Sequence, residues 1–60
     1  MSDQEIIDAI DAEIALTRNL SRRVKLNTPG AAETLLANIC YVNGLYFARA
    51  LIVKRMEGGK

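Results

Sequence analysis

Apolar residues in the first third of the chain recur every three or four positions, which is the spacing of one face of an α-helix. The residues Ser2-Asp3-Gln4-Glu5 precede them and have the sequence of a capping box, so we expect the helix to begin there. The apolar arc of the helical wheel covers about half of its circumference, and its members are Leu16, Ala9, Leu20, Ile6, Val24, Ile10, Ile14 and Ile7. The pattern therefore predicts a first helix over residues 3–26.

This pattern stops at an Asn-Thr-Pro-Gly run at residues 27–30. Asparagine tolerates the left-handed conformation at a helix end, threonine can cap the next helix, and proline suits the first helical position. We therefore predict a tight turn at residues 27–28 and a second helix over residues 29–56. Because the turn is short, the two helices are expected to run antiparallel as an all-α helical hairpin, with one domain over residues 1–60.

The second predicted helix is apolar on every side. Its strongly polar residues over positions 35–53 are only Asn38, Asn43 and Arg49. A helix of this kind belongs in a protein core or in a membrane, and one partner helix cannot cover it. We therefore predict a homo-oligomeric helical bundle in which the second helix is central and the first helix lies outside.

Small residues at spacings of three or four mark one face of the second helix, and close helix packing favours such residues. A glycine within a helix costs about 1 kcal/mol relative to alanine, so Gly44 favours a close helix crossing at that point. The alternative is a tolerated weak helix former. We assign the oligomer interface to Ala37, Cys40, Gly44, Ala48, Leu45 and Ile52.

A transmembrane helix is the alternative for the same segment, because residues 35–53 are nearly long enough to span a bilayer and two basic residues follow them. The three polar side chains would cost several kcal/mol in lipid, whereas the core of an oligomer can pair them. We therefore expect no membrane association. A cytoplasmic location is predicted, because the single Cys40 is unpaired within the chain and the N-terminus lacks a signal-peptide pattern.

The composition argues against catalysis. The chain has 60 residues, no His and one Cys, so it offers neither a zinc-type ligand set nor a Ser/His or Cys/His nucleophile pair. We therefore predict a protein that is not an enzyme, with no catalytic residue, no metal and no cofactor.

Charges segregate along the chain, although eight Lys and Arg nearly balance seven Asp and Glu. The first 17 residues contain five acidic side chains and no basic one, whereas residues 18–25 contain four basic side chains and no acidic one. In a hairpin centred near residue 28, Arg49 lies level with Asp8 and the open end is neutralised. The turn end is left net positive.

Helix N-termini with adjacent basic side chains bind phosphate or carboxylate groups. We therefore predict a phosphate-binding site at the turn end, formed by Arg22, Arg23, Lys25, Thr28 and Gly30. The hydroxyl of Thr28 and the amide of Gly30 are its expected phosphate donors. In the alternative interpretation Thr28 only caps the helix and the basic residues form a solvated face.

Glu13 lies within the apolar arc of the first helix, where an unpaired carboxylate would be expensive. Arg49 of another subunit, Asn43 or Tyr46 are the candidate partners. We predict a polar seam of Glu13 and Arg49 that fixes the register of the subunits, with a ligand-facing role for Glu13 as the alternative.

Two families share features with this chain. The segment Asn43-Gly44-Leu45-Tyr46-Phe47-Ala48-Arg49-Ala50-Leu51, with Glu13-Ile14-Ala15-Leu16 upstream, is similar to the hairpin of small phage anti-CBASS proteins. That resemblance implies a higher oligomer that sequesters cyclic oligonucleotide signals at subunit boundaries. The architecture also looks like Rop, the plasmid copy-number regulator, which implies a dimeric four-helix bundle that binds paired RNA loops.

The sequence thus predicts a non-enzymatic, homo-oligomeric small binding protein. Its leading function is that of a phage-type anti-defence protein that sequesters a cyclic nucleotide or another anionic ligand. The alternative is a Rop-like regulatory or structural bundle that binds RNA or a partner protein.

Overall fold

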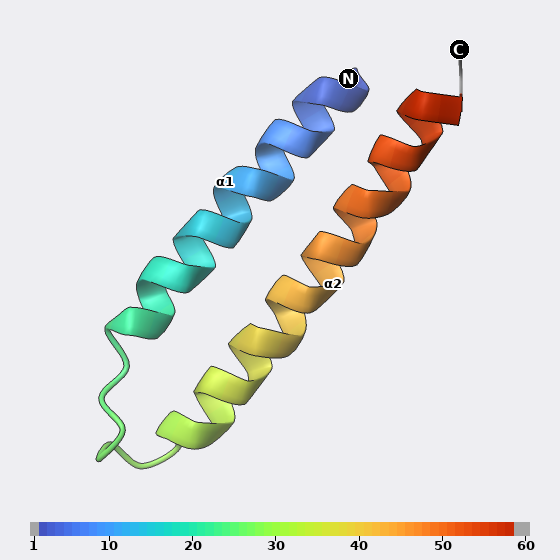
Figure 1. Cartoon of the computed structure of the whole chain (residues 1–60). Coiled ribbons are helices and arrows are strands. Elements are labelled where there is room, and N and C mark those ends of the chain that lie inside the picture. Colours follow the sequence, from blue (N-terminus) through green and yellow to red (C-terminus); the bar gives the residue numbers. More distant parts are fainter. Residues whose placement is uncertain (1, 59–60) are drawn as a thin grey trace.

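Two antiparallel α-helices make up the protein (Figure 1). The computed structural model describes residues 2–58, with α1 at Asp3–Arg22, α2 at Ala31–Gly58 and a connection over residues 23–30. The hairpin measures 50 × 15 × 13 Å, and α1 begins at the end of the hairpin where α2 finishes. The predicted all-α helical hairpin is therefore confirmed.

The start of α1 is held by the predicted capping box. The backbone N–H of Glu5 donates to the Ser2 hydroxyl at 3.2 Å, and the backbone N–H of Ser2 donates to the Glu5 carboxylate at 3.3 Å. Both groups would otherwise lack a partner at a helix N-terminus. The first helix therefore begins where the sequence predicts.

The first helix ends earlier than predicted, at Arg22 rather than near residue 26. Its last turn tightens, because the backbone N–H groups of Arg23 and Val24 donate to the carbonyls three residues earlier, at 3.1 and 3.2 Å. Among residues 2–58, no residue other than glycine has a positive φ. The prediction that Asn27 adopts the left-handed conformation is therefore wrong.

The second helix begins at Ala31, two residues later than predicted. Gly30 directly precedes it with a φ of 80°, and its carbonyl accepts the first helical hydrogen bond, from the Thr34 N–H at 3.0 Å. The predictions that Thr28 caps α2 and that Pro29 is its first residue are therefore wrong. Only glycine adopts this φ at little cost, so the chain makes its last change of direction at residue 30 and the helix follows.

The two helices meet along one stripe on each, with contact positions that alternate between spacings of three and four residues. This is the spacing of left-handed coiled-coil packing. The buried residues are Ile7, Ile14, Thr17 and Ala31. The half-buried residues at the same spacing are Ile10, Ser21, Leu35, Asn38, Val42, Leu45, Arg49 and Ile52.

The buried stripe of α1 is narrower than the predicted apolar arc. Leu16 and Leu20 remain about half exposed, and Ala9 is also exposed. Thr17, which the arc did not include, is buried instead. One neighbouring helix covers only a narrow seam, so the flank of the arc is left without a partner inside the hairpin.

Most of the apolar surface of α2 is uncovered. Leu36, Phe47 and Leu51 are more than half exposed, and none of the apolar 18-residue window of this helix is buried. By length and composition alone, α2 could also cross a membrane. The hairpin therefore covers the apolar surface of α1 more completely than that of α2.

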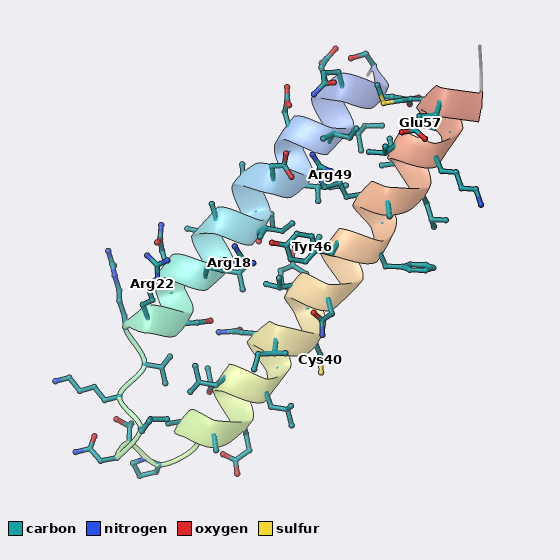
Figure 2. The ribbon with its side chains drawn as sticks, in the orientation of Figure 1. Arg18, Arg22, Cys40, Tyr46, Arg49 and Glu57 are labelled. Atoms are coloured by element: carbon teal, nitrogen blue, oxygen red, sulfur yellow. The ribbon has the colours of Figure 1, made fainter. Side chains whose placement is uncertain are left out.

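Residues assigned to the oligomer interface divide between two sides of α2. Ala37, Cys40 and Gly44 are exposed, and Figure 2 shows Cys40 pointing away from α1. By contrast, Leu45 and Ile52 are half-buried on the side of α2 that packs on α1, and Ala48 is half-buried beside them. Because α1 needs apolar partners along its own stripe, Leu45 and Ile52 serve the hairpin itself rather than the outer surface.

We expect Gly30→Ala to destabilise the hairpin by about 1–2 kcal/mol, because a side chain opposes the positive φ at this position. The thermal midpoint should fall by roughly 5–10 °C at equal protein concentration. Thermal unfolding followed by circular dichroism measures this change. Gly58→Ala, at the far end of α2 and also in open space, is the matched control and should leave the midpoint nearly unchanged.

Candidate functional site

Polar side chains join the two helices at several levels between the turn and the open end. Nearest the turn, the Asn38 side-chain amide donates to the Ser21 hydroxyl at 2.9 Å, and that hydroxyl donates to the Thr17 carbonyl at 2.9 Å. Asn38 therefore makes an interhelical hydrogen bond within the hairpin. Both groups are partly buried, so this pair opposes any sliding of the helices that would leave it unpaired.

Glu13 finds a partner within its own chain. The Tyr41 hydroxyl donates to the Glu13 carboxylate at 3.2 Å. Sequence reasoning proposed Arg49, Asn43 or Tyr46 for this role and missed Tyr41. A contact of Glu13 with Arg49 of another subunit stays a prediction.

The charged pairs of the open end follow a register that differs slightly from the predicted one. Arg49 donates to the Asp11 carboxylate at 2.8 Å rather than lying beside Asp8, and Arg55 forms an ion pair with Asp3. The pairs Arg49–Asp11 and Asn38–Ser21 centre the hairpin nearer residue 30 than residue 28. This shift moves Arg49 by about one helical turn along α1.

A groove of about 460 Å³ follows one flank of the hairpin toward the turn end. Residues from both helices line it, and they are Arg18, Ser21, Arg22, Asn38, Ile39, Val42, Asn43 and Tyr46. The Arg18 guanidinium lies 5.4 Å from the centre of the Tyr46 ring, which is a cation–π distance. Figure 2 shows these two side chains in the space between the helices, with Arg22 further toward the turn.

The groove combines three kinds of chemistry. Arg18 and Arg22 supply positive charge and planar donors that match a phosphate or carboxylate. The Asn43 amide offers both a donor and an acceptor, as does the part of Asn38 that is not bound to Ser21. Tyr46 adds an aromatic face, so the groove suits an anion that carries a planar group.

The turn-end residues predicted to bind phosphate lie at the end of α1 and on the connection. Arg22, Arg23, Lys25, Thr28 and Gly30 are all exposed, and Arg22 is the only one of these five that lines the groove. The Ala31 amide, at the start of α2, donates to the Thr28 carbonyl at 3.1 Å. This hydrogen bond closes a turn of the connection, so the Ala31 amide is not free for a ligand.

Sequence reasoning missed Arg18 and Tyr46 as members of a binding surface. Arg18 and Arg22 stand one helical turn apart on α1, and Asn43 and Tyr46 stand three residues apart on α2. Such spacings place each pair on one flank of its helix. Which flanks face each other depends on the register of the hairpin, which the sequence did not supply.

A second hollow of about 400 Å³ lies at the open end, where Gln4 and Glu57 are part of its lining. Arg49 also borders it, but its guanidinium is engaged with Asp11. Charges of both signs line this hollow, so it has less preference for an anion than the groove. Within residues 2–58 no cluster of His, Cys, Asp or Glu is suited to holding a metal ion.

The Tyr41–Glu13 contact is expected to make the stability of the hairpin depend on pH. Partial desolvation between the helices, the hydrogen bond to Glu13 and the charge of that carboxylate raise the pKa of Tyr41 above the ordinary 10.0. Because the folded state favours the neutral phenol, this contact stabilises the hairpin below pH 10 and is lost as the pH rises through the raised pKa.

Absorbance titration of the phenol in a Tyr46→Phe variant isolates Tyr41, and its midpoint should lie above the ordinary tyrosine value. Adding Glu13→Gln removes the carboxylate charge and should lower that midpoint toward the ordinary value. An unchanged midpoint after Glu13→Gln would contradict the contact.

Comparison with protein-family models, with curated proteins and with solved structures gives no match for this chain. The resemblances to the anti-CBASS proteins and to Rop therefore stay predictions. The support for a function comes from the groove and from the uncovered surface of α2.

Proposed function

We propose that this chain is a non-enzymatic, homo-oligomeric binding protein for a small anionic ligand, with nucleotides, cyclic ones included, as its ligand class. The observation that carries the proposal is the groove between α1 and α2, in which two arginines, two asparagines and a tyrosine converge. Sequestration of a cyclic nucleotide signal, as in a phage-type anti-defence protein, is the specific form of this function.

The phosphate and the base of a nucleotide each match different residues of the groove. Its phosphate can accept from the guanidinium groups of Arg18 and Arg22, because planar donor pairs fit phosphate oxygens. Its base can stack on the Tyr46 ring, and stacking of this kind contributes about 1–3 kcal/mol per base. The Asn43 amide can pair with the edge of the base, which adds selectivity.

The turn end supports this groove by its charge. Arg23 and Lys25 are exposed close to it in the chain, and Glu33 is the acidic residue of the first turn of α2. A local excess of positive charge raises the concentration of anions near the groove and speeds their association. We therefore assign Arg23 and Lys25 to attraction of the ligand rather than to direct contact.

Self-association is the second part of the proposal. The groove is open to solvent along one flank, and the apolar window of α2 is not buried by the hairpin. A 60-residue chain without a disulfide has little stability to spare. Covering α2 with further copies supplies the missing burial and accounts for the small and apolar residues on its outer side.

Adjacent arginines on this chain provide a sharp test of the groove. We expect Arg22→Gln to weaken binding of a cyclic dinucleotide at least roughly tenfold, because a charged hydrogen-bond donor to phosphate is lost. Arg23→Gln is the matched control: it removes the same charge from the next residue, outside the groove, and should weaken binding less than about threefold. Isothermal titration calorimetry measures both.

The two variants also separate the groove from the turn end. Equal losses from Arg22→Gln and Arg23→Gln would assign binding to the turn-end charge rather than to the groove. Absence of calorimetric binding to the wild-type protein for cyclic dinucleotides, linear mononucleotides and short RNA alike would refute the ligand class. Tight binding to RNA hairpins alone would favour the Rop-like function.

The proposal also predicts the behaviour of the whole protein on extraction. A cytoplasmic oligomer should remain in the detergent-free soluble fraction, and native mass spectrometry should give a multiple of the subunit mass together with any co-purified ligand. Recovery only with detergent would assign α2 to a membrane instead, in keeping with its length and composition. The polar pairs of Asn38 and Arg49 with α1 argue for the soluble form.

A further inference from the structure

The side of α2 opposite α1 carries a second regular stripe. Each of its residues stands two positions after a residue that faces α1, which places it about 200° around the helix. We call this set the outer stripe, and its members, all exposed, are Glu33, Ala37, Cys40, Gly44, Phe47, Leu51 and Lys54. Their spacing alternates between four and three residues, as in the seam of a coiled coil.

The exposed area of the hairpin is larger than that of a stable monomer. It exposes 4697 Å², whereas a compact protein of 6.6 kDa exposes roughly 3,900 Å². The excess, roughly 800 Å², is about the area that each partner contributes to a standard protein interface. Phe47 and Leu51, the two large apolar residues of the outer stripe, are 68% and 54% exposed and contribute to that excess.

Along the outer stripe the small residues Ala37, Cys40 and Gly44 come first, and the larger residues Phe47, Leu51 and Lys54 follow. This separation of sizes favours one direction of pairing between two copies. In a parallel pair of helices each position faces its own copy, so Phe47 would crowd Phe47 while Gly44 faced an empty layer. In an antiparallel pair, each large residue can face a small one. The space needed for a partner exists at Gly44, where an added Cβ would meet nothing within 4 Å.

We propose that a second copy of this chain packs antiparallel along the outer stripe, with Phe47 of each copy over Gly44 of the other. In this register Leu51 faces Cys40 and Lys54 faces Ala37, so every layer joins one large residue and one small residue. The α2 helices lie at the centre of the assembly and the α1 helices lie on its two outer sides.

Charge favours the same direction. The antiparallel register brings Glu33 of one copy within about one helical turn of Lys54 of the other, at both ends of the contact. Arg55 is already paired with Asp3, whereas Lys54 is exposed on the outer stripe. A parallel pair would place Glu33 beside Glu33 and Lys54 beside Lys54, which is unfavourable.

This inference rests on the self-association in the proposed function and adds the partner, the direction and the register. It leaves the groove accessible, because Arg18 and Tyr46 line a flank of the hairpin where α1 and α2 meet rather than the outer side of α2. Ligand binding and the antiparallel contact can therefore be tested separately.

Disulfide trapping tests the register. Under mild oxidation, Leu51→Cys should form a covalent dimer roughly tenfold faster than the wild type, because the new thiol faces Cys40 of the second copy. In the wild type the two Cys40 thiols are about 16 Å apart along the helix axis in this register, so they should not couple. Ala50→Cys is the matched control, since its exposed side chain points away from the outer stripe.

Tryptic peptides identify the bond. Cys40 lies on the peptide that ends at Arg49, and position 51 lies on the next peptide, which ends at Lys54. A link between these two peptides supports the proposal. A rapid Cys40–Cys40 link in the wild type indicates the parallel arrangement and overturns it, as does a link of Leu51→Cys to itself alone or equal trapping of Ala50→Cys.

Measurement of mass in the same samples separates this inference from the proposed function. An oligomer that shows no link between the two peptides refutes the register and leaves the binding function intact. A monomeric mass for the wild type at all concentrations refutes both the antiparallel contact and the self-association in the proposed function.

Discussion

The two helices differ in the extent of their apolar surface, and the rest of the structure depends on this difference. The α1 helix has one apolar stripe, whereas α2 is apolar all round. A pair of helices buries one stripe on each member. The hairpin therefore buries the apolar stripe of α1 and leaves the opposite side of α2 in solvent. Within residues 2–58 the buried residues are only Ile7, Ile14, Thr17 and Ala31, which reflects this limit. We therefore propose that stability depends on a further partner, and the proposed second copy of the chain would supply it with complementary residue sizes and charges.

Polar contacts between the helices fix the register of α2 along α1. Apolar side chains at spacings of three and four would tolerate a slide of one heptad, but the hydrogen bond between Asn38 and Ser21 would then be lost. The ion pair of Arg49 with Asp11 marks the same register toward the open end. This register also brings Arg18 beside Tyr46, so the geometry that aligns the hairpin also forms the groove.

The proposed binding site lies in the groove on the flank of the hairpin, whereas the sequence analysis predicted it at the turn end. A helix N-terminus with free amides is a common anion site, but here Gly30 and the Thr28 carbonyl close the turn and satisfy the Ala31 amide. The basic residues of the connection remain as a source of positive potential. Direct contact is better supplied by side chains that both helices hold in place, because their positions are fixed by packing.

Local interactions explain what could be predicted from sequence. The capping box at Ser2 and Glu5 depends on groups three residues apart, and the two helices depend on periodicity within each segment, so both followed from sequence alone. The predicted turn at residues 27–28 lies within the observed connection, where the Thr28 N–H donates to the Lys25 carbonyl at 3.0 Å. Several residues near it can change the chain direction, so the sequence did not show that Gly30 adopts the positive φ.

By itself the sequence determined two helices, their antiparallel pairing and an excess of apolar surface on the second helix. Only the tertiary structure decided that Tyr41 pairs with Glu13, that Arg49 pairs with Asp11, and that Arg18 lies over Tyr46. These contacts join residues 28 to 38 positions apart, and their alignment depends on the length and conformation of residues 23–30. Periodicity describes each helix separately, and therefore it could not supply the register between them.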